Sequence, residues 1–327
     1  MSSDTHFQVI VIGGGPAGVG AATKLSKRGI NSVAVIERSD KIGGIPALYK
    51  TKKGGVRTFV RWSRGGMPVF GDAYARWLSA HLEKTDVRVW LNSQVTEIDA
   101  KDKKIVLVNP DEGRLTLTAD AIIMACGARE ETAAERGWVS GSRPIRVYFT
   151  KQLLQLIDGN GLSPMRNPVI IGSDLIAYAA AAKLKAAGSE NAVIVDNRNR
   201  PRCSVFERLY FRLWSNPEFR GMETKSVEVV GTGVASGIKF SEGSDVIPCD
   251  GIVVCGELIP NSELALMGKL RVDLETRKPV VASGFRLSEP GWFIAGNMLG
   301  GFHGAEWCFF NGRRVARVVS DYLSSTM

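Results

Sequence analysis

Residues 7–37 read FQVIVIGGGPAGVGAATKLSKRGINSVAVIE, and their pattern indicates a local fold. Val9–Ile12 is a short, continuous apolar run of the kind that a parallel sheet buries on both faces. A glycine turn follows it, then a helix rich in small residues to about Lys27, and then a second apolar run that ends at Glu37. Strand, turn, helix and strand in this order predict one βαβ unit.

The glycines of this turn have the spacing G-x-G-x-x-G, which binds a dinucleotide when a strand precedes it and a helix follows. Gly13 allows the tight turn, Gly15 lets a pyrophosphate approach the backbone, and Gly18 lets the helix pack closely on the strand. We expect the N-terminus of the helix that follows to face the phosphates. The sequence therefore predicts a dinucleotide site at this turn.

An acidic residue and a second glycine pair support the same site. Glu37 lies 24 residues after Gly13, where a carboxylate can accept hydrogen bonds from ribose hydroxyls and would repel a 2′-phosphate. Gly43 and Gly44 can let the backbone pass beside the cofactor, and the buried strand Ala121–Met124 ends in a turn of small residues. These features do not by themselves distinguish FAD from NAD.

Four motifs occur along the chain in the order VIGGGPAG at residues 11–18, GG at 43–44, ACG at 125–127 and PGWFIAGN at 290–297. In this order they resemble the two-dinucleotide-binding-domain flavoproteins, the superfamily of glutathione and thioredoxin reductases, where all four belong to one FAD site. The resemblance implies an α/β fold of two Rossmann-like domains, with an FAD-binding domain split by an inserted NAD(P)-type domain. We expect these parts to span residues 1–140, 141–258 and 259–327.

The resemblance also implies which residues hold FAD. Cys126 stands where threonine is usual, and Asn297 stands where an aspartate of the family binds the ribityl chain, although an amide can also hydrogen-bond a hydroxyl. The helix that begins near Ala305 should aim backbone N–H groups at the flavin edge where negative charge develops on reduction. The expected FAD-binding residues are Gly13, Gly15, Pro16, Ala17, Gly18, Glu37, Arg38, Gly43, Gly44, Val95, Cys126, Gly127, Gly296, Asn297, Ala305 and Glu306.

Residues 167–177 read NPVIIGSDLIA and begin a second βαβ pattern, whose next strand is Ala192–Val195. In the family that the chain resembles, this is the NAD(P)H domain. Its middle glycine position is Asp174 here and its last is Ala177, and an aspartate that points at a pyrophosphate would repel it. We therefore expect a degenerate NAD(P)H site. Three arginines after this strand either meet a 2′-phosphate or form a solvated basic loop, which we favour: Arg198, Arg200 and Arg202.

Two further motifs, ACGARE at residues 125–130 and LGGFHGAEW at 299–307, narrow the resemblance. They resemble the FAD subunits of heteromeric, dye-linked dehydrogenases that oxidise amines, opines, proline or hydroxyproline. Many members carry a cysteine-rich [2Fe-2S] domain at the C-terminus, whereas this sequence ends at Met327 without one. The resemblance therefore implies partner subunits, namely a second flavoprotein, an iron–sulfur protein or both.

The cysteines argue against disulfide chemistry. Five are present and none forms a C-x-x-C or C-x-4-C pair, so that neither a zinc site, a disulfide framework nor a redox-active disulfide is indicated. The flavin must then exchange electrons directly with a substrate, a nicotinamide or another cofactor. No residue is assigned as catalytic; His303 is either a proton donor or a structural residue, and we favour the structural role.

Length and composition limit the number of domains and the class of protein. A chain of 327 residues favours two domains, and its 36 glycines exceed the average share without the period of collagen. No apolar run is long enough for a transmembrane segment, the polar start argues against a signal peptide, and the cysteine usage fits the cytoplasm. Much of the net charge of +9 lies in one stretch, which is either a solvated loop or, as we prefer, a docking surface for an acidic partner rather than nucleic acid. Its residues are Lys50, Lys52, Lys53, Arg57, Arg61 and Arg64.

The leading hypothesis is an FAD-dependent subunit that relays electrons within a heteromeric amine, opine or imino-acid dehydrogenase. In this case a partner chain can hold the flavin that oxidises the substrate, and the sequence does not name that substrate. The first alternative is a stand-alone NAD(P)H-dependent flavin reductase that donates electrons to a small carrier protein. The second is a non-catalytic scaffold subunit whose nucleotide sites are degenerate.

Overall fold

The computed structural model describes residues 5–49, 57–61, 65–138, 143–224, 226–240 and 245–326. Contacts divide the chain into two compact units: Met1–Ala47, Phe59–Arg129 and Leu258–Met327 form the first, and Leu48–Thr58 with Glu130–Glu257 form the second. The first boundary therefore lies at residue 129 rather than the expected 140. The described residues 48–49 and 57–58 group with the second unit, although the expected bounds placed them in the FAD-binding domain.

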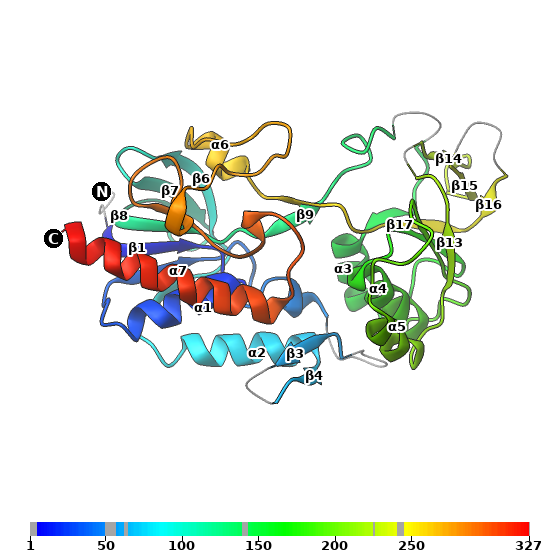
Figure 1. Cartoon of the computed structure of the whole chain (residues 1–327), viewed down its shortest axis with the longest axis horizontal. Helices are drawn as coiled ribbons and strands as arrows, with labels where there is room; N and C mark the ends of the chain where they lie inside the picture. The colour runs from blue at the N-terminus through cyan, green and yellow to red at the C-terminus, as the bar shows by residue number, and fades with distance from the viewer. Residues whose placement is uncertain are drawn as a thin grey trace. The chain divides into compact units, whose positions relative to one another are not determined.

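The first unit contains a sheet with strand order β5-β2-β1-β8-β7-β6, in which β19 also pairs with β8 (Figure 1). Strands β5, β2, β1, β8 and β19 run parallel to one another. Strands β7 and β6 continue the sheet in antiparallel pairs. The apolar runs read from the sequence form its buried centre, where Ile10 pairs with Ala34 on one side and with Ile122 on the other. The strands are β1 Thr5–Ile12, β2 Val33–Ile36, β5 Arg88–Trp90, β6 Gln94–Asp99, β7 Lys104–Asn109, β8 Gly113–Met124 and β19 Trp292–Ile294.

Two helices of the first unit pack closely through glycines. Helices α1 (Pro16–Ser26) and α7 (Ala305–Thr326) lie side by side in Figure 1. A Cβ atom at Gly20 would lie 2.1 Å from the carbonyl oxygen of Phe309, and one at Gly312 would lie 1.9 Å from that of Ala17. Part of the glycine excess therefore serves helix-on-helix packing, which the motifs in the sequence did not reveal. The remaining elements are β3 Phe59–Arg61, β4 Met67–Val69, α2 Gly71–Leu82 and α6 Glu263–Met267.

The second unit repeats the parallel α/β pattern, with strand order β10-β17-β11-β12-β13, and adds an antiparallel sheet β14-β15-β16. Two Rossmann-like units, as predicted, make up the fold. Its elements are β10 Val147–Phe149, α3 Thr150–Asn160, β11 Pro168–Ile171, α4 Leu175–Ala186, β12 Val193–Asp196, α5 Val205–Arg212, β13 Glu218–Gly221, β14 Glu228–Val230, β15 Gly237–Lys239, β16 Ile247–Pro248 and β17 Gly251–Val254. Strands β9 Ala128–Glu130 and β18 Leu258–Pro260 pair where the chain leaves the first unit and returns to it.

An ion pair joins α3 to α4 inside the second unit. The Nζ atom of Lys183 lies 3.0 Å from Oδ1 of Asp158, and the two side chains are only 7% and 5% exposed. A charge in such a place is stable only while its partner is present, because the interior cannot replace the lost hydration. This pair therefore ties the two helices together.

Two sequence expectations concern surfaces. None of the helices in the described ranges has the length and apolar character needed to cross a membrane. Of the basic stretch, only Arg57 and Arg61 fall within the described ranges; Lys50, Lys52, Lys53 and Arg64 lie outside the described residues.

Candidate functional site

Two glycines of the first turn are required by the fold itself. Gly13 has φ +114°, and a Cβ atom there would lie 2.4 Å from the carbonyl oxygen of Ala125. A Cβ atom at Gly18 would lie 1.8 Å from the carbonyl oxygen of Gly13. The strand, the turn and the start of α1 are thus pressed together, and no larger residue fits at either position.

Gly15 is different, because nothing in the chain requires it to be glycine. Its φ of −75° and ψ of −177° suit any residue, and beyond its chain neighbours the nearest atom to a Cβ there would be the Cα of Gly44, at 3.9 Å. It is the N-cap of α1, without a side chain to occupy the N–H groups of the first turn, and that turn has no acidic residue. The space and the helix dipole together fit the pyrophosphate of a dinucleotide.

Glu37 is held in place by two backbone donors. Its Oε2 accepts a hydrogen bond of 2.7 Å from the N–H of Gly14, its Oε1 accepts one of 2.8 Å from the N–H of Ser39, and the residue is 7% exposed. Each carboxylate oxygen keeps a further lone pair that can accept from a ribose hydroxyl. The N–H of Gly43 donates to the carbonyl of Gly14 at 2.9 Å, so the turn, the acid and the Gly43-Gly44 pair form one framework. The adjacent Arg38 is exposed.

The C-terminal residues meet this framework at Gly296. A Cβ atom at Gly296, where φ is +70°, would lie 2.7 Å from the Cβ of Ala17, so the end of the chain packs on the start of α1. The next residue is engaged within its own loop: Nδ2 of Asn297 donates to the carbonyl of His303, and Oδ1 accepts from its N–H, both at 3.1 Å. An aspartate could not donate to that carbonyl, so the asparagine has a local structural role.

The side chains at the start of α7 are also paired. The hydroxyl of Tyr74 donates to Oε2 of Glu306 at 2.9 Å, and Glu306 is 6% exposed. Burial of the hydroxyl raises the pKa of Tyr74 most, and the neighbouring carboxylate of Glu306 raises it further. His303 stacks on Trp307 with ring centroids 3.7 Å apart, and desolvation lowers its pKa. A stacked, partly desolvated ring fits the structural role for His303.

Three expected residues offer little side-chain chemistry to a ligand. Val95 is 3% exposed in the core, which leaves only its backbone available to a ligand. Burial raises the pKa of the Cys126 thiol to about 12, so it is protonated at neutral pH and unsuited to act as a nucleophile. Gly127 has φ +72°, and a Cβ atom there would meet nothing within 4 Å.

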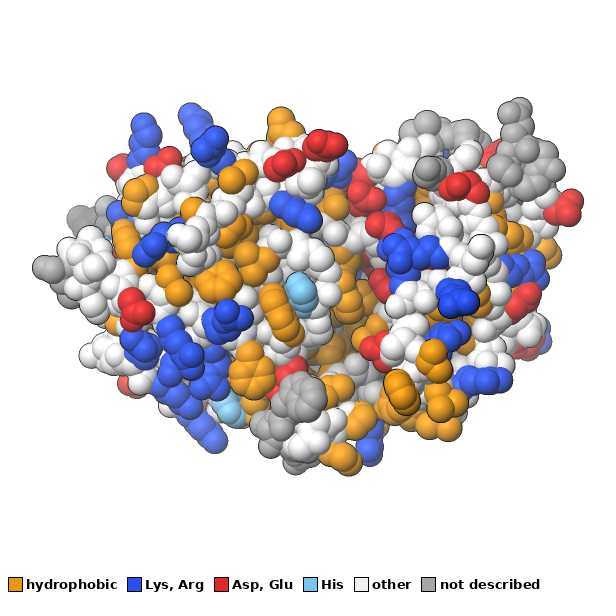
Figure 2. Space-filling view, in the orientation of Figure 1, with side chains coloured by type: hydrophobic (Ala, Val, Ile, Leu, Met, Phe, Trp, Pro, Cys, Tyr) orange, Lys and Arg blue, Asp and Glu red, His pale blue; other side chains and the backbone are white. Residues whose placement is uncertain are grey.

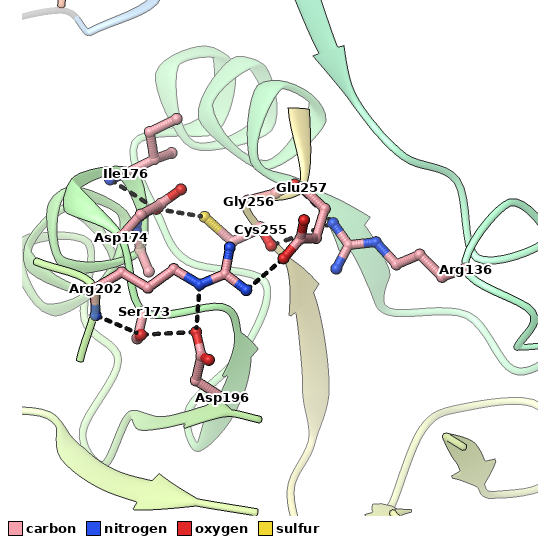
Figure 3. Close-up of polar contacts among 10 residues, drawn as sticks. Arg136, Ser173, Asp174, Ile176, Asp196, Arg202, Cys255, Gly256 and Glu257 are labelled. Carbon is pink, nitrogen blue, oxygen red and sulfur yellow. Dashed lines mark hydrogen bonds and ion pairs between the residues drawn. The ribbon is translucent and has the colours of Figure 1, made fainter. Parts of the chain in front are cut away.

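The corresponding turn in the second unit is occupied by the chain itself (Figure 3). Asp174 is the N-cap of α4, and its Oδ1 accepts hydrogen bonds from the N–H groups of Ile176 and Ala177 at 3.0 and 3.1 Å. In a dinucleotide-binding domain, groups at this place point to the pyrophosphate. The carboxylate therefore takes the anion position, a stronger block than the repulsion expected from the sequence.

The acid that would meet the ribose is likewise paired internally. Asp196, 2% exposed at the end of β12, accepts from the hydroxyl of Ser173 at 2.7 Å and pairs with Nε of Arg202 at 3.4 Å. Arg202 also pairs with Glu257, as Figure 3 shows. The interpretation of Arg202 as part of a solvated loop was therefore wrong. The cavity among these groups measures about 30 Å³, room for about one water molecule.

The charge of Asp174 should make the second unit less stable at neutral pH. Burial raises the pKa of this carboxyl above its usual value. The folded state thus binds the proton more tightly than the unfolded chain, and the free energy of unfolding falls as pH rises from the unfolded pKa through the folded one. Asparagine caps a helix about as well as aspartate, so Asp174→Asn should unfold at a higher temperature than wild type at pH 7.

Circular dichroism during heating tests this expectation, with a second series at about pH 3, where the wild-type carboxyl is protonated and the two proteins should converge. A variant that is less stable than wild type at pH 7 would show instead that the negative charge on the helix N-terminus is stabilising.

Residues 7–315 match the family described as pyridine nucleotide-disulphide oxidoreductase. The chain belongs to this family. It is accordingly an FAD-type, flavin-dependent oxidoreductase, in a family whose members bind FAD and use NAD(P)H. The residues of the first turn fit FAD, whereas at the second turn the carboxylate of Asp174 occupies the N–H groups that would meet a pyrophosphate.

Relatives and solved structures agree with this assignment. The chain is 25% identical to a subunit of opine oxidase from Rhizobium meliloti, over 95% of this chain and 62% of the relative. It is 25% identical to hydrogen cyanide synthase subunit HcnB of Pseudomonas protegens, over 94% and 69%. Thioredoxin reductase of T. acidophilum has the same fold, with a TM-score of 0.73 and 20% identity over 99% of this chain and 100% of that one. L-proline dehydrogenase of P. horikoshii also has this fold, with a TM-score of 0.69 and 18% identity over 98% of this chain and 56% of that one. The chain therefore spans about two thirds of the length of the opine oxidase subunit and of HcnB.

Proposed function

We propose that this chain is the FAD-binding, electron-relaying subunit of a heteromeric dehydrogenase that oxidises an amine, an opine or an imino acid. The observation that carries the proposal is the contrast between the two helix N-termini. That of α1 is open beside Gly15, whereas that of α4 is closed by the carboxylate of Asp174. A flavoprotein without an open pyridine-nucleotide site needs another source or acceptor of electrons. Two relatives are named as subunits, one of opine oxidase and one of hydrogen cyanide synthase, which supports a partner chain.

Bound FAD supplies a carrier that takes up two electrons and passes them on. The chain's own part is to bind and orient it. Glu37 offers acceptors for the ribose, and the first turn of α1 offers N–H groups to the pyrophosphate. The N-terminus of α7 would add a positive dipole end for the flavin. These are the residues with which we expect FAD to be retained.

The thiols do not offer an electron path. All five cysteines are free, and burial raises the pKa of Cys126, Cys203 and Cys308 to about 12 and that of Cys249 to about 11. Burial disfavours the thiolate that dithiol–disulfide exchange requires, and the sequence has no C-x-x-C or C-x-4-C pair that could form the disulfide from which the family takes its name. They also fit a reducing compartment, and we place the enzyme in the cytoplasm.

Anaerobic stopped-flow mixing with NADH and with NADPH tests the proposal. We expect the visible flavin absorbance to bleach no faster than in buffer, because the second turn has no place for the pyrophosphate. Dithionite should still reduce the flavin. Rapid bleaching by either nucleotide would overturn the proposal in favour of the stand-alone flavin reductase.

Affinity purification of the tagged chain from its source cells provides the second arm. A co-purifying flavoprotein or iron–sulfur protein, together with flavin reduction by an amine, an opine or an imino acid in the complex, is the expected result. Purified complex whose flavin no substrate reduces would favour the scaffold alternative.

A further inference from the structure

A cavity lies between α1, α2 and α7 of the first unit, and of the residues expected to bind FAD its lining includes Glu306. Its volume of about 130 Å³ is close to that of engineered cavities that bind benzene, about 150 Å³. It can therefore hold one ring or one branched aliphatic group. Its lining residues are Thr23, Lys24, Lys27, Trp77, His81, Glu306, Phe309, Phe310 and Arg313.

One part of the lining is aromatic. The rings of Trp77 and Phe309 have centroids 5.0 Å apart, and those of Trp77 and His81 are 4.4 Å apart. Phe310 remains 44% exposed at the edge of the cavity. Aromatic faces held in place by one another form a preorganised apolar wall, which loses little conformational entropy when a ligand packs on it.

The other part is basic and lacks counter-ions. Lys24, Lys27 and Arg313 line the cavity, and within the described ranges none of the three has an ion-pair partner. Desolvation, followed by the nearby Arg317 and Arg313, lowers the pKa of Lys24. Figure 2 shows the Lys and Arg side chains gathered over α1 and α7. The one acid of the lining, Glu306, is buried and already accepts from Tyr74.

We propose that this cavity binds an acid that carries an apolar group: the anion contacts Lys24, Lys27 and Arg313, and the apolar group packs on Trp77 and Phe310. Neither half of the lining suffices alone, because an uncharged ring leaves the cations unpaired and a bare anion leaves the aromatic wall in water. The same chemistry can come from a free aromatic carboxylate or from neighbouring acidic and aromatic side chains of a partner protein. This inference does not depend on the proposed function.

Trp77 reports occupancy through its fluorescence. The flavin-loaded protein is titrated with 3-phenylpropionate, with its uncharged analogue 3-phenylpropionamide, and with acetate, and the signal of the Trp77→Phe variant is subtracted. We expect saturable quenching by the phenylpropionate, weakened by salt, and at least about tenfold weaker binding of the amide and of acetate, a difference of about 1.4 kcal/mol. The blocked peptide acetyl-Asp-Phe-Asp-amide distinguishes the sources. If the peptide binds more tightly than phenylpropionate does, the ligand is a segment of a partner protein. If the peptide binds more weakly, the ligand is a free acid.

Charge reversal at the three cations, Lys24→Glu with Lys27→Glu and Arg313→Glu, should lower the affinity for phenylpropionate at least about tenfold. The matched control reverses three exposed cations elsewhere in the first unit, Lys101, Lys269 and Arg271, and so changes the net charge equally. It should bind like wild type because these residues do not line the cavity. Flavin content and circular dichroism verify that both variants are folded, and Phe310→Ala offers a milder test of the apolar wall. Equal binding of acid and amide, or equal weakening in the control, would overturn the proposal.

Discussion

Replacement of Gly15 by valine is expected to produce a folded protein that no longer binds FAD. The backbone angles at this position suit valine, and its Cβ would meet nothing closer than 3.9 Å within the chain beyond its immediate neighbours. The added atoms would occupy the space that the pyrophosphate needs beside the first turn of α1. We expect the FAD affinity to fall at least about 100-fold, close to 3 kcal/mol. Flavin absorbance of the purified protein and its circular dichroism measure the two properties separately.

Gly18→Val is the matched control for this experiment. Its Cβ would lie 1.8 Å from the carbonyl oxygen of Gly13, so the variant should lose both the native fold and FAD. Gly15→Ala should give an intermediate affinity. If Gly15→Val retained a full complement of FAD, the pyrophosphate would have to lie elsewhere and the assignment of this turn would be wrong.

Substitution of Lys183 by methionine should destabilise the second unit by about 3–5 kcal/mol. The change leaves Asp158, whose side chain is 5% exposed, without the cation that lies 3.0 Å from it. Methionine has similar length and fills the space between α3 and α4, so the loss reports the uncompensated charge more than a cavity. Urea unfolding followed by a probe of the second unit measures it.

Two further variants separate charge from packing. Lys185→Met changes an exposed lysine of the same helix and should alter the stability by no more than about 0.5 kcal/mol. Lys183→Met combined with Asp158→Leu removes both charges and should recover most of the loss. Equal destabilisation by the single and the double variant would show that shape, and not charge, determines the effect.

Local patterns predicted the architecture well, because each depends on a few neighbouring residues. The apolar runs at Val9–Ile12 and Val33–Ile36 became central parallel strands, and the predicted helix after the glycine turn begins at Pro16. The family assignment rests on the same short motifs and is confirmed over residues 7–315. The FAD-binding roles of individual residues remain predictions, although Gly15 and Glu37 have the geometry that such roles require.

Expectations about the partner of a polar side chain fared less well. Arg202 belongs to an ion-pair network because Asp196 and Glu257, from separate strands and loops, converge on it. Asn297 carries the polar group expected, but its amide closes a loop with His303. Spacing along a chain reveals which groups are present at a turn, whereas burial and the approach of other segments select the partner of each group.

The two glycine-turn positions illustrate this division. The amino-acid order alone established two βαβ units, one with Gly15 and the other with Asp174 at the matching place, because turn sterics and strand periodicity act over a few residues. It did not reveal that Asp174 turns back to cap its own helix, or that α1, α2 and α7 bring unpaired cations and aromatic rings to one cavity. The cap joins Asp174 to residues only two and three positions further on, so its signal was local. The cavity arises from contacts between residues up to about three hundred positions apart, and such contacts form only when the whole chain packs.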